Sequence, residues 1–562
     1  MSNHIMSSHS QHYPYQLPRE TPTGSRGERR YAIADIVQLG ASRETWRDDA
    51  SPALDLRLLF PLLAGGIARI ARTVMPEARR TIERFRMRLM LRLFRALFLL
   101  AIVVMSAGLA GCSLNKPYQA PDTKAAALKN LDASLFAAQP YDPRWWRQFD
   151  DPVLEGLETA ALAANHDIRV AVARVQQARS IFDDVKLDRY PTVTVGAFAE
   201  KREQAIPGFT QEPVQTTTYR AGFDAFWEID VFGRVRSAVR AAAASAQGFE
   251  ATLEDVRVSV AAEVARNYFE LRGLQQQLAV AERSLANQRE TLRLTQVRRD
   301  AGFGEEFDVA SAAARVAAIE AGIPPVRTGI AEREHRLAVL IGKRPGEAGV
   351  DLAPRPYPII AKALPIGESD KLLSRRPDVR AAERRVAEAA AREGVAYAEL
   401  FPRITVTGVL GLLAGRGSVF GTSDSRAWAV TPALNWAAFD LGSARARLRG
   451  AQAGTIETVA SYELTVLRAL EETENALVAY REQQERLVKL ADQARESTRA
   501  AAIARTRYRE GVADFLSLLD AERTQLQAED AVAQAEAGAF TTVVAVYKAL
   551  GGISEAPASS AP

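Results

Sequence analysis

The sequence has little cysteine and histidine, and this shortage limits the chemistry that it can perform. Its 562 residues include one cysteine, Cys112, and five histidines, of which only His166 and His335 lie beyond the first dozen residues. One cysteine excludes an internal disulfide and zinc sites built from several thiolates. No glycine loop of the nucleotide-binding P-loop form occurs either. We therefore expect no catalytic site, no metal site and no cofactor, and a protein that is not an enzyme.

The net charge of the chain is also small. The net charge is +4 and the pI is near 9.0, and much of the excess comes from arginines before residue 96. That distribution does not make a nucleic-acid-binding surface, so we expect no nucleic-acid partner. The mean hydropathy of -0.13 is not that of a helical membrane protein. A content of 47% hydrophobic and 25% charged residues is typical of a folded chain.

The first 111 residues are predicted to be absent from the mature protein. Residues 1–86 lack a periodic pattern and read as an extension, whereas residues 87–111 have a basic start, an apolar run and a small-residue end, as a signal peptide does. The segment Leu109–Cys112 resembles the lipobox of bacterial lipoproteins, in which the cysteine becomes the acylated N-terminus. Ser113 follows it instead of aspartate, which points to the outer membrane. The alternative is a short membrane helix, but the run is shorter than the ~20 residues that a span needs.

One supersecondary unit occurs twice. The segment Asp167–Gly196 aligns without a gap with Asp378–Thr407, and nine positions are identical. Each copy has an Ala- and Arg-rich helical run, then Pro191 or Pro402, then an alternating run of β-branched residues that predicts a strand. The chain is therefore expected to consist of two repeats, 112–342 and 371–550, joined by a Pro- and Gly-rich linker at 343–370 and followed by a disordered tail at 551–562.

Each repeated helix is followed by a predicted hairpin of membrane length. The expected strands are 191–203 and 217–230 in the first repeat, and 402–413 and 426–439 in the second. A tilted transmembrane strand needs ~9 to 11 residues, so these runs are long enough to cross a bilayer. A soluble hairpin is the alternative. Four strands cannot close a membrane barrel, which needs about 8 or more, so the membrane interpretation requires several chains.

Very long helices follow the hairpins. Residues 234–300 contain no proline, and Val264, Leu271, Leu278, Leu285 and Leu292 recur every seven residues, as in a coiled coil. A partner helix is predicted over 444–509. A structural coiled coil alone would explain the heptads, but not the membrane-length hairpin before each rod or the tight return after it.

The two returns have the same chemistry. Each ends a basic helix with glycine, at Gly302 and Gly304 or at Gly511, and restarts with an acidic residue, Glu305 or Asp514. Glycine supplies a left-handed cap, and carboxylates suit the positive N-terminal end of the next helix. Because these turns lie farthest from the strands, they are expected to form a tip on the periplasmic side.

The chain resembles the TolC-like outer-membrane factors of tripartite efflux systems, in their lipoprotein branch. The resemblance is carried by the Trp145–Leu154 opening, WW-x-x-F-x-D-P-x-L, placed after a lipobox and before an Asp-Ile-Arg helix, and it covers residues from about 112 to 550. It implies a mixed α and β membrane protein, a homotrimer whose twelve strands form a β-barrel continued by an α-helical periplasmic barrel. The implied partners are a periplasmic adaptor, which meets the tip, and an inner-membrane RND-type pump.

The segment Leu518–Arg523 is similar to the motif that forms the inner gate in this family. Its Asp520 and Arg523 are three residues apart, so both lie on one helix face. A solvated surface pair is the alternative. The first repeat offers Asp308 and Arg315 at the corresponding place, which is not the same pair, so we place the gate in the second repeat. The predicted function is a passive exit duct for drugs, toxic compounds or metals; the alternatives are a type I protein-secretion duct and a periplasmic coiled-coil scaffold lipoprotein.

Overall fold

The computed structural model describes residues 118–121, 128–139, 142–205, 212–358, 360, 363–367 and 372–552. The predicted extension, the signal peptide, Cys112 and residues 553–562 lie outside the described residues. The elements occur in the order β1 (Phe136–Ala137), η1 (Trp145–Phe149), α2 (Pro152–Ala164), α3 (His166–Leu187), β2 (Thr192–Gln204), β3 (Val214–Ile229), α4 (Arg234–Asp300), α5 (Glu306–Leu340), β4 (Leu364–Pro365), α6 (Leu372–Arg375), α7 (Pro377–Ala398), β5 (Arg403–Ala414), η3 (Ser423–Ser425), β6 (Arg426–Asn435), α8 (Leu441–Arg509) and α9 (Phe515–Ala549).

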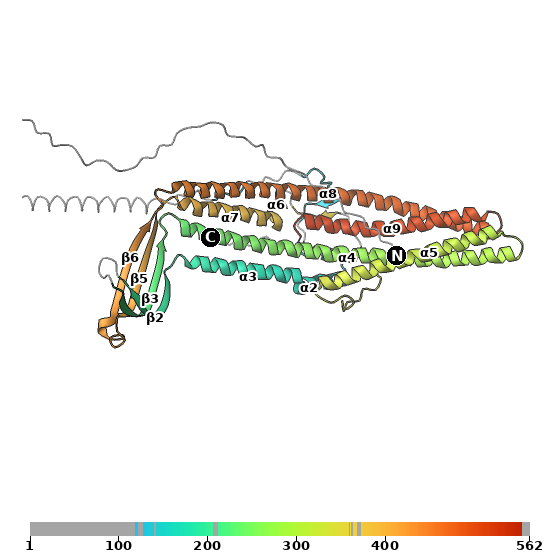
Figure 1. The fold of residues 1–562 in the computed structure, drawn as a ribbon. Helices are drawn as coiled ribbons and strands as arrows, with labels where there is room; N and C mark the ends of the chain where they lie inside the picture. The colour runs from blue at the N-terminus through green and yellow to red at the C-terminus, as the bar shows by residue number, and fades with distance from the viewer. Residues whose placement is uncertain are drawn as a thin grey trace, which may run out of the picture. The chain divides into compact units, whose positions relative to one another are not determined.

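The internal repeat predicted from the sequence is confirmed (Figure 1). Helix α3 leads into the β2–β3 hairpin and then α4 and α5, and helix α7 leads into the β5–β6 hairpin and then α8 and α9. Pro191 and Pro402 stand just before the first strand of each hairpin, where a proline ends the preceding helix. Two indole N–H groups fasten the junctions, because Trp227 donates to the Arg189 carbonyl and Trp436 to the Leu400 carbonyl, each at 3.1 Å.

Three boundaries differ from the predicted ones by three residues or more. Strand β3 begins at Val214 and not at 217, because its pairing with β2 extends as far as Val214 opposite Gln204. Strand β6 ends at Asn435 and not at 439, since Trp436 leaves the sheet to bind the Leu400 carbonyl. Helix α8 begins at Leu441, three residues before the predicted start. Helix α4 occupies the predicted range of 234–300.

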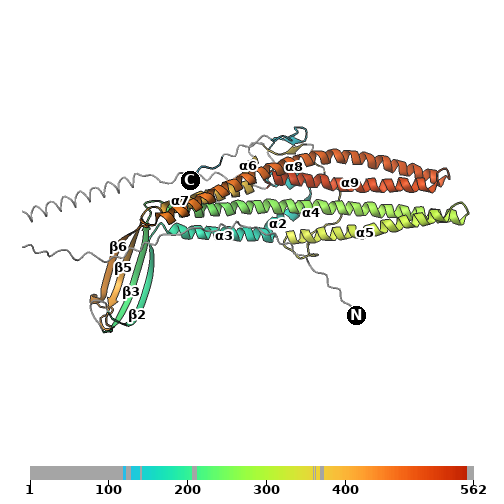
Figure 2. The same cartoon turned by 45° about the horizontal axis from the view of Figure 1, so that its top comes forward.

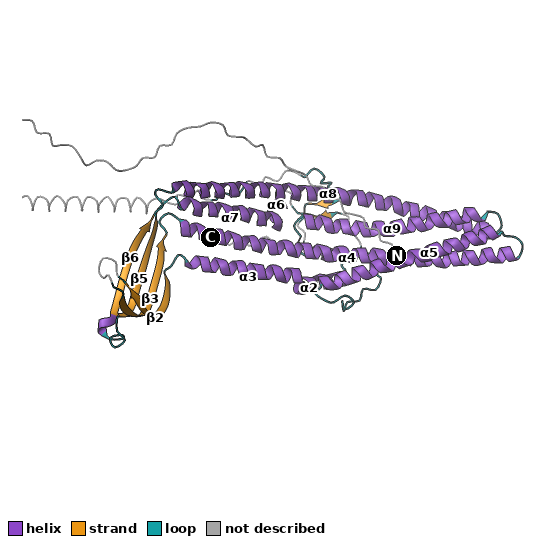
Figure 3. Cartoon of the chain, viewed as in Figure 1, coloured by secondary structure: helices purple, strands orange, loops and turns teal. Residues whose placement is uncertain are grey.

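The two hairpins form one antiparallel sheet with two open edges. Its strand order is β2-β3-β5-β6, so β2 and β6 each lack a neighbour on one side in the single chain (Figure 3). The strands contain 13, 16, 12 and 10 residues, which is enough for each to cross a bilayer. The register has no bulge, so every second residue along each strand faces the same side.

The two faces of this sheet differ in polarity. What we call the polar face carries the even-numbered residues of β2 and β3 and the odd-numbered residues of β5 and β6, among them Thr, Glu, Arg and Asp. The apolar face carries the alternate residues, including Val195, Phe223, Leu410 and Trp428. In the four described strands, the charged residues of the apolar face are confined to the loop ends of β2 and β6. Such a sheet suits lipid on one side and water on the other.

The helices form two long hairpins that run away from the sheet (Figures 1 and 2). Helices α4 and α8 contain 67 and 69 residues, so each is about 100 Å long at 1.5 Å per residue. The predicted heptad seam of α4 is buried at Val264, Leu271 and Leu285. Leu285 packs with Val316 and Ile319 of α5. Helix α5 is long and apolar enough to cross a membrane by length and composition, and some of its apolar side chains, among them Val316 and Ile319, are buried in these contacts.

An aromatic core lies where the two helical hairpins meet the Trp-Trp opening. Trp145 stacks on Tyr547 of α9 at 5.2 Å between ring centroids, and Phe149 meets Phe269 of α4 at 5.1 Å. Each of these side chains is at most 3% exposed. Aromatic pairs in such geometries contribute about 0.5–1.5 kcal/mol beyond their buried area. The opening motif therefore joins elements from both repeats.

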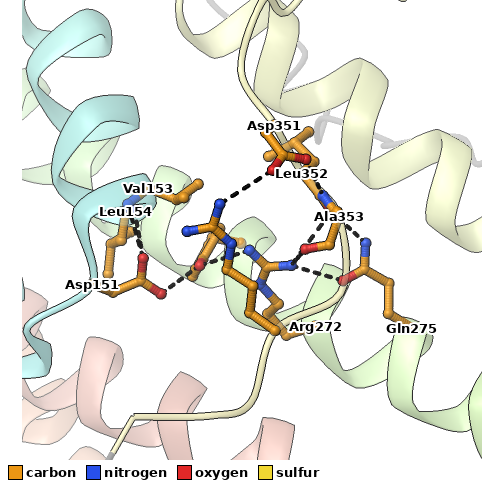
Figure 4. Close-up of polar contacts among 10 residues, drawn as sticks. Asp151, Val153, Leu154, Arg272, Gln275, Asp351, Leu352 and Ala353 are labelled. Carbon is orange, nitrogen blue, oxygen red and sulfur yellow. Dashed lines mark hydrogen bonds and ion pairs between the residues drawn. The ribbon is translucent and has the colours of Figure 1, made fainter.

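A buried arginine ties this core to the segment between the repeats (Figure 4). Arg272 of α4 donates to the Tyr268 hydroxyl at 2.9 Å, to the Gln275 side chain at 3.0 Å and to the Ala353 carbonyl. The Tyr268 hydroxyl donates to Asp151, whose carboxylate also accepts two backbone amides at the start of α2. Residues 343–358 of the predicted linker are thus fastened to α4. Gly551 and Gly552, the first two residues of the predicted tail, form the left-handed turn that ends α9.

Candidate functional site

The two turns at the far end of the helical hairpins have the same backbone geometry. Gly302 and Gly511 both have φ of +78°. The Gly302 N–H donates to the Arg299 carbonyl, and the Gly511 N–H donates to the Tyr508 carbonyl. The N–H of the residue after each glycine donates to the carbonyl one position earlier, that of Arg298 or Arg507. This Schellman arrangement requires a left-handed residue, for which glycine is favoured. The left-handed caps predicted from the sequence are therefore confirmed at both turns.

The acidic residues that follow the turns behave differently. Asp514 caps α9, because its carboxylate accepts the Ser517 N–H at 2.6 Å, and the hydrogen bonds from Ser517 lower its pKa. Glu305 stands at the corresponding position before α5, but its side chain makes no cap hydrogen bond. Gly304 has another role than its predicted cap, because a β-carbon there would lie 2.9 Å from the Arg299 backbone nitrogen.

The two turns at the tip are joined to each other. Arg298 at the end of α4 donates to the Tyr508 carbonyl of α8 at 2.8 Å, and its guanidinium lies 4.6 Å from the centroid of the Tyr508 ring. Tyr508 in turn packs against Phe515 of α9 at 5.8 Å between ring centroids. Both rings are at most 5% exposed. A shift of one helical hairpin at the tip therefore has to disturb the other.

Large apolar side chains project from the same turns. Phe303 is 80% exposed and Phe307 is 60% exposed in the first turn, and Val512 and Leu516 are 64% and 55% exposed in the second. These four residues were not predicted to belong to the tip surface. Their signal is visible in the sequence, because each turn places one apolar residue directly after its glycine and a second four residues later. The pattern gives the tip an apolar surface on both hairpins.

Asp520 and Arg523 lie on an exposed face of α9, one to two turns beyond the second tip. The two side chains bind each other at 2.5 Å, and they are 66% and 55% exposed. The predicted common face is confirmed. In the single chain their mutual contact is of the kind that contributes about 0–1 kcal/mol.

The residue between this pair was missed by the sequence analysis. Glu522 is 7% exposed and accepts hydrogen bonds from Arg505 of α8 at 3.0 Å and 3.1 Å, and from Thr291 of α4 at 3.3 Å. Burial raises its pKa, and the charge of Arg505 opposes that shift. Glu522 therefore connects three helices behind the exposed pair. Its sequence neighbours alone do not reveal this role.

Arg315 of α5, in the first repeat, lies near Glu522 and Arg523. Burial lowers its pKa, and so does the positive charge of Arg523 nearby, while Glu522 acts in the opposite direction. From the sequence, Arg315 was not predicted as part of the gate, because its spacing from Asp308 differs from that of the second-repeat pair. The fold nevertheless brings it to the charges of α9. Charge interactions can therefore hold these helices together. Among the described residues, no group of three metal-ligating side chains occurs.

Comparisons with known proteins agree on one family. Residues 157–343 and 369–552 match the family described as outer membrane efflux protein. The pyoverdine export outer membrane protein OpmQ of Pseudomonas putida is 31% identical over 466 residues, which cover 81% of this chain and 97% of that protein. The antibiotic efflux pump outer membrane protein ArpC of Pseudomonas putida is 30% identical over 467 residues, covering 81% and 95% of the two chains.

Solved structures show the same fold. The outer-membrane channel OprN aligns with a TM-score of 0.77 and 48% identity, and the match covers 78% of this chain and 99% of that one. The open state of the Neisseria gonorrhoeae MtrE outer membrane channel aligns with a TM-score of 0.69 and 28% identity, covering 78% and 98% of the two chains.

Proposed function

We propose that this chain, which belongs to the outer membrane efflux protein family, is the outer-membrane exit duct of a tripartite efflux system. One observation carries the proposal: a membrane-length sheet with two open edges continues directly into helical hairpins about 100 Å long. A duct needs both parts, one for the bilayer and one for the periplasm. The relatives are named for the export of pyoverdine and the efflux of antibiotics. For this chain we propose small molecules as the cargo.

We propose a homotrimer, and the open edges of the sheet support the pairing between chains that it needs. An unpaired strand edge is not tolerated in lipid, so β2 and β6 have to pair with another chain. Three chains of four strands supply twelve, which exceeds the minimum of about 8 for a membrane barrel. We therefore propose that β6 of one chain pairs with β2 of the next. The helices would then surround one central passage.

The tip is proposed as the surface that meets a periplasmic adaptor. Gly302, Gly304 and Gly511 shape its turns, and Glu305 and Asp514 give them acidic edges. Exposed apolar side chains beside these residues, such as Phe303, provide area for burial. Transport through the duct would be passive, with energy supplied by an inner-membrane RND-type pump acting through the adaptor.

Asp520 and Arg523 are proposed as the periplasmic gate. Both side chains are more than half exposed in the single chain, so they are available to a neighbouring chain. Around a threefold axis they would form a ring of alternating charge. Glu522, buried behind them, would hold α9 to α8 and α4 while the exposed pair faces the passage.

The lipid anchor is proposed at Cys112. We expect Cys112→Ser to abolish acylation, because only sulfur can carry the thioether-linked diacylglycerol. Cells grown with radioactive palmitate would show a labelled wild-type protein and an unlabelled variant. Label that persists on the serine variant would place the lipid elsewhere.

Deleting the gene tests the exit-duct proposal in the cell. We expect the deletion strain to retain more of a fluorescent efflux dye than its parent, and the plasmid-borne gene to restore the parental level. Dye retention would be measured in energised cells, with culture-medium proteins compared in parallel. Unchanged retention of every dye tested, together with loss of one secreted protein from the medium, would favour the type I secretion duct instead.

A further inference from the structure

An ion pair lies along strand β3 on the polar face of the sheet. Arg220 and Asp224 are bonded through the guanidinium and the carboxylate, and their side chains are 31% and 40% exposed. In a strand, residues four apart are separated by about 13 Å between Cα atoms. The two side chains must therefore lie flat over the residue between them, which is Gly222.

Gly222 belongs to a row of glycines that covers three of the four strands. Gly196, Gly222 and Gly411 are paired in register on the polar face. A β-carbon on Gly222 would lie 2.7 Å from the Leu410 carbonyl oxygen and 2.8 Å from the Gly411 Cα. On the apolar face, a β-carbon on Gly408 would meet the Ala225 β-carbon at an ordinary 3.5 Å.

This contrast shows the direction in which the sheet curves. Groups on the concave side of a curved sheet converge, and groups on the convex side spread apart. The crowding at Gly222 and Gly411 makes the polar face the concave one where β3 meets β5, whereas a β-carbon on Gly196 of β2 would meet only the Asp224 carboxylate, at 3.8 Å. In a closed barrel the concave face lines the interior, so curvature and polarity independently place Arg220 and Asp224 inside.

The charges on this face are balanced. Arg220 lies 6.0 Å from the centroid of the Phe198 ring on the neighbouring strand, which limits the positions of its guanidinium. Glu200 binds Arg202 at 2.5 Å on the same face of β2. Nearer the helices, Glu228 binds Arg234 at 2.6 Å. Each carboxylate named here thus has a guanidinium beside it.

We propose that Arg220 and Asp224 form a charge-balanced ring in the barrel interior that keeps the passage nearly unselective for the sign of a solute's charge. The proposal rests on the trimeric duct proposed above, which repeats the pair three times around the lumen. A solute passing the glycine row meets a guanidinium donor and a carboxylate acceptor together. Cationic and anionic cargo both find a counter-charge, so the wild-type passage discriminates little between them.

Removing one partner exposes the charge of the other. With Arg220→Gln, three carboxylates remain around the lumen without their guanidinium, and with Asp224→Asn three guanidiniums remain. Rings of one charge sign select for ions of the opposite sign. The two variants are therefore expected to shift selectivity in opposite directions, and the double variant to return toward the wild type.

The test is the permeability ratio of K⁺ to Cl⁻ for trimers in planar bilayers under a KCl gradient. We expect Arg220→Gln to raise this ratio about threefold and Asp224→Asn to lower it about threefold, as a change in potential of about half a kT per unit charge near the ring would do. Arg426→Gln is the matched control, because Arg426 lies on the apolar face at the loop end of β6. Wild-type ratios in both single variants would overturn the proposal.

A second measurement keeps the proposal testable if the charge variants fail to assemble. In a Cys112→Ser background, Thr194→Cys on the polar face should react with a charged, water-soluble thiol reagent in the assembled channel. Val195→Cys on the apolar face should not react. The reverse pattern would overturn the assignment of the interior. A wild-type protein that forms no trimer and no conducting channel would instead remove the proposed duct itself.

Discussion

Replacing Asp520 and Arg523 together with alanine is expected to raise the conductance of the closed channel about tenfold. In the single chain the pair is exposed and its two members bind each other at 2.5 Å. If each of three copies contributes about 0.5 kcal/mol to the closed tip, their loss changes the balance of closed and open forms by about 1.5 kcal/mol. The measurement is the current through trimers in planar bilayers.

A matched control uses another exposed pair with the same chemistry. Asp492 and Arg495 of α8 are also three residues apart and bind at 2.8 Å, but they lie further from the tip. The double alanine variant at 492 and 495 should keep the wild-type conductance. Closed-state conductance that does not change in the 520 and 523 variant would remove this pair from the gate.

Replacing Gly411 with alanine is expected to prevent assembly of the trimer. The added methyl group would overlap the Ala221 carbonyl oxygen and lie 2.6 Å from the Gly222 Cα. Both are backbone atoms, so the strand β5 would have to move away from β3. Overpacking of this kind costs about 1–3 kcal/mol in each chain. Because the strain recurs in every chain around a closed barrel, we expect little or no folded trimer.

Gly408 offers the control on the opposite face of the same strand. A methyl group there would meet the Ala225 β-carbon at 3.5 Å, which is an ordinary contact. Gly408→Ala should therefore assemble like the wild type, as judged by the trimer band in unheated gels. Equal yields of trimer from the two alanine variants would show that the polar face is not crowded and would also weaken the inference about Arg220.

The regular features of the fold were visible in the sequence because local rules determine them. The absence of proline gave the extent of α4, and Gly302 and Gly511 marked the left-handed caps. The repeat was recognised from matching helix and strand patterns. Strand β6 was predicted too long, because the contact that ends it joins Trp436 to Leu400, 36 residues earlier in the chain.

The charges behind the proposed gate depend on tertiary packing and could not be predicted. Glu522 is buried only because α8 brings Arg505 and α4 brings Thr291 to it. The spacing of Arg315 from Asp308 is a property of the first repeat alone. Its electrostatic interaction with Arg523 depends on how the two repeats pack together. Asp520 and Arg523 were identified from the similarity of Leu518–Arg523 to the gate motif of the family and from their spacing on α9. Interactions between residues of different helices depend on tertiary packing, which the sequence pattern of one helix does not specify.

The trimeric barrel is the central claim, and the heat sensitivity of the purified mature protein in detergent tests it most directly. We predict a particle with three times the mass of one chain, which stays intact in unheated gels and changes mobility on boiling as the β-barrel unfolds. Such behaviour follows from pairing β6 of one chain with β2 of the next. A single chain with no heat-dependent change in mobility would contradict the claim and favour a periplasmic scaffold.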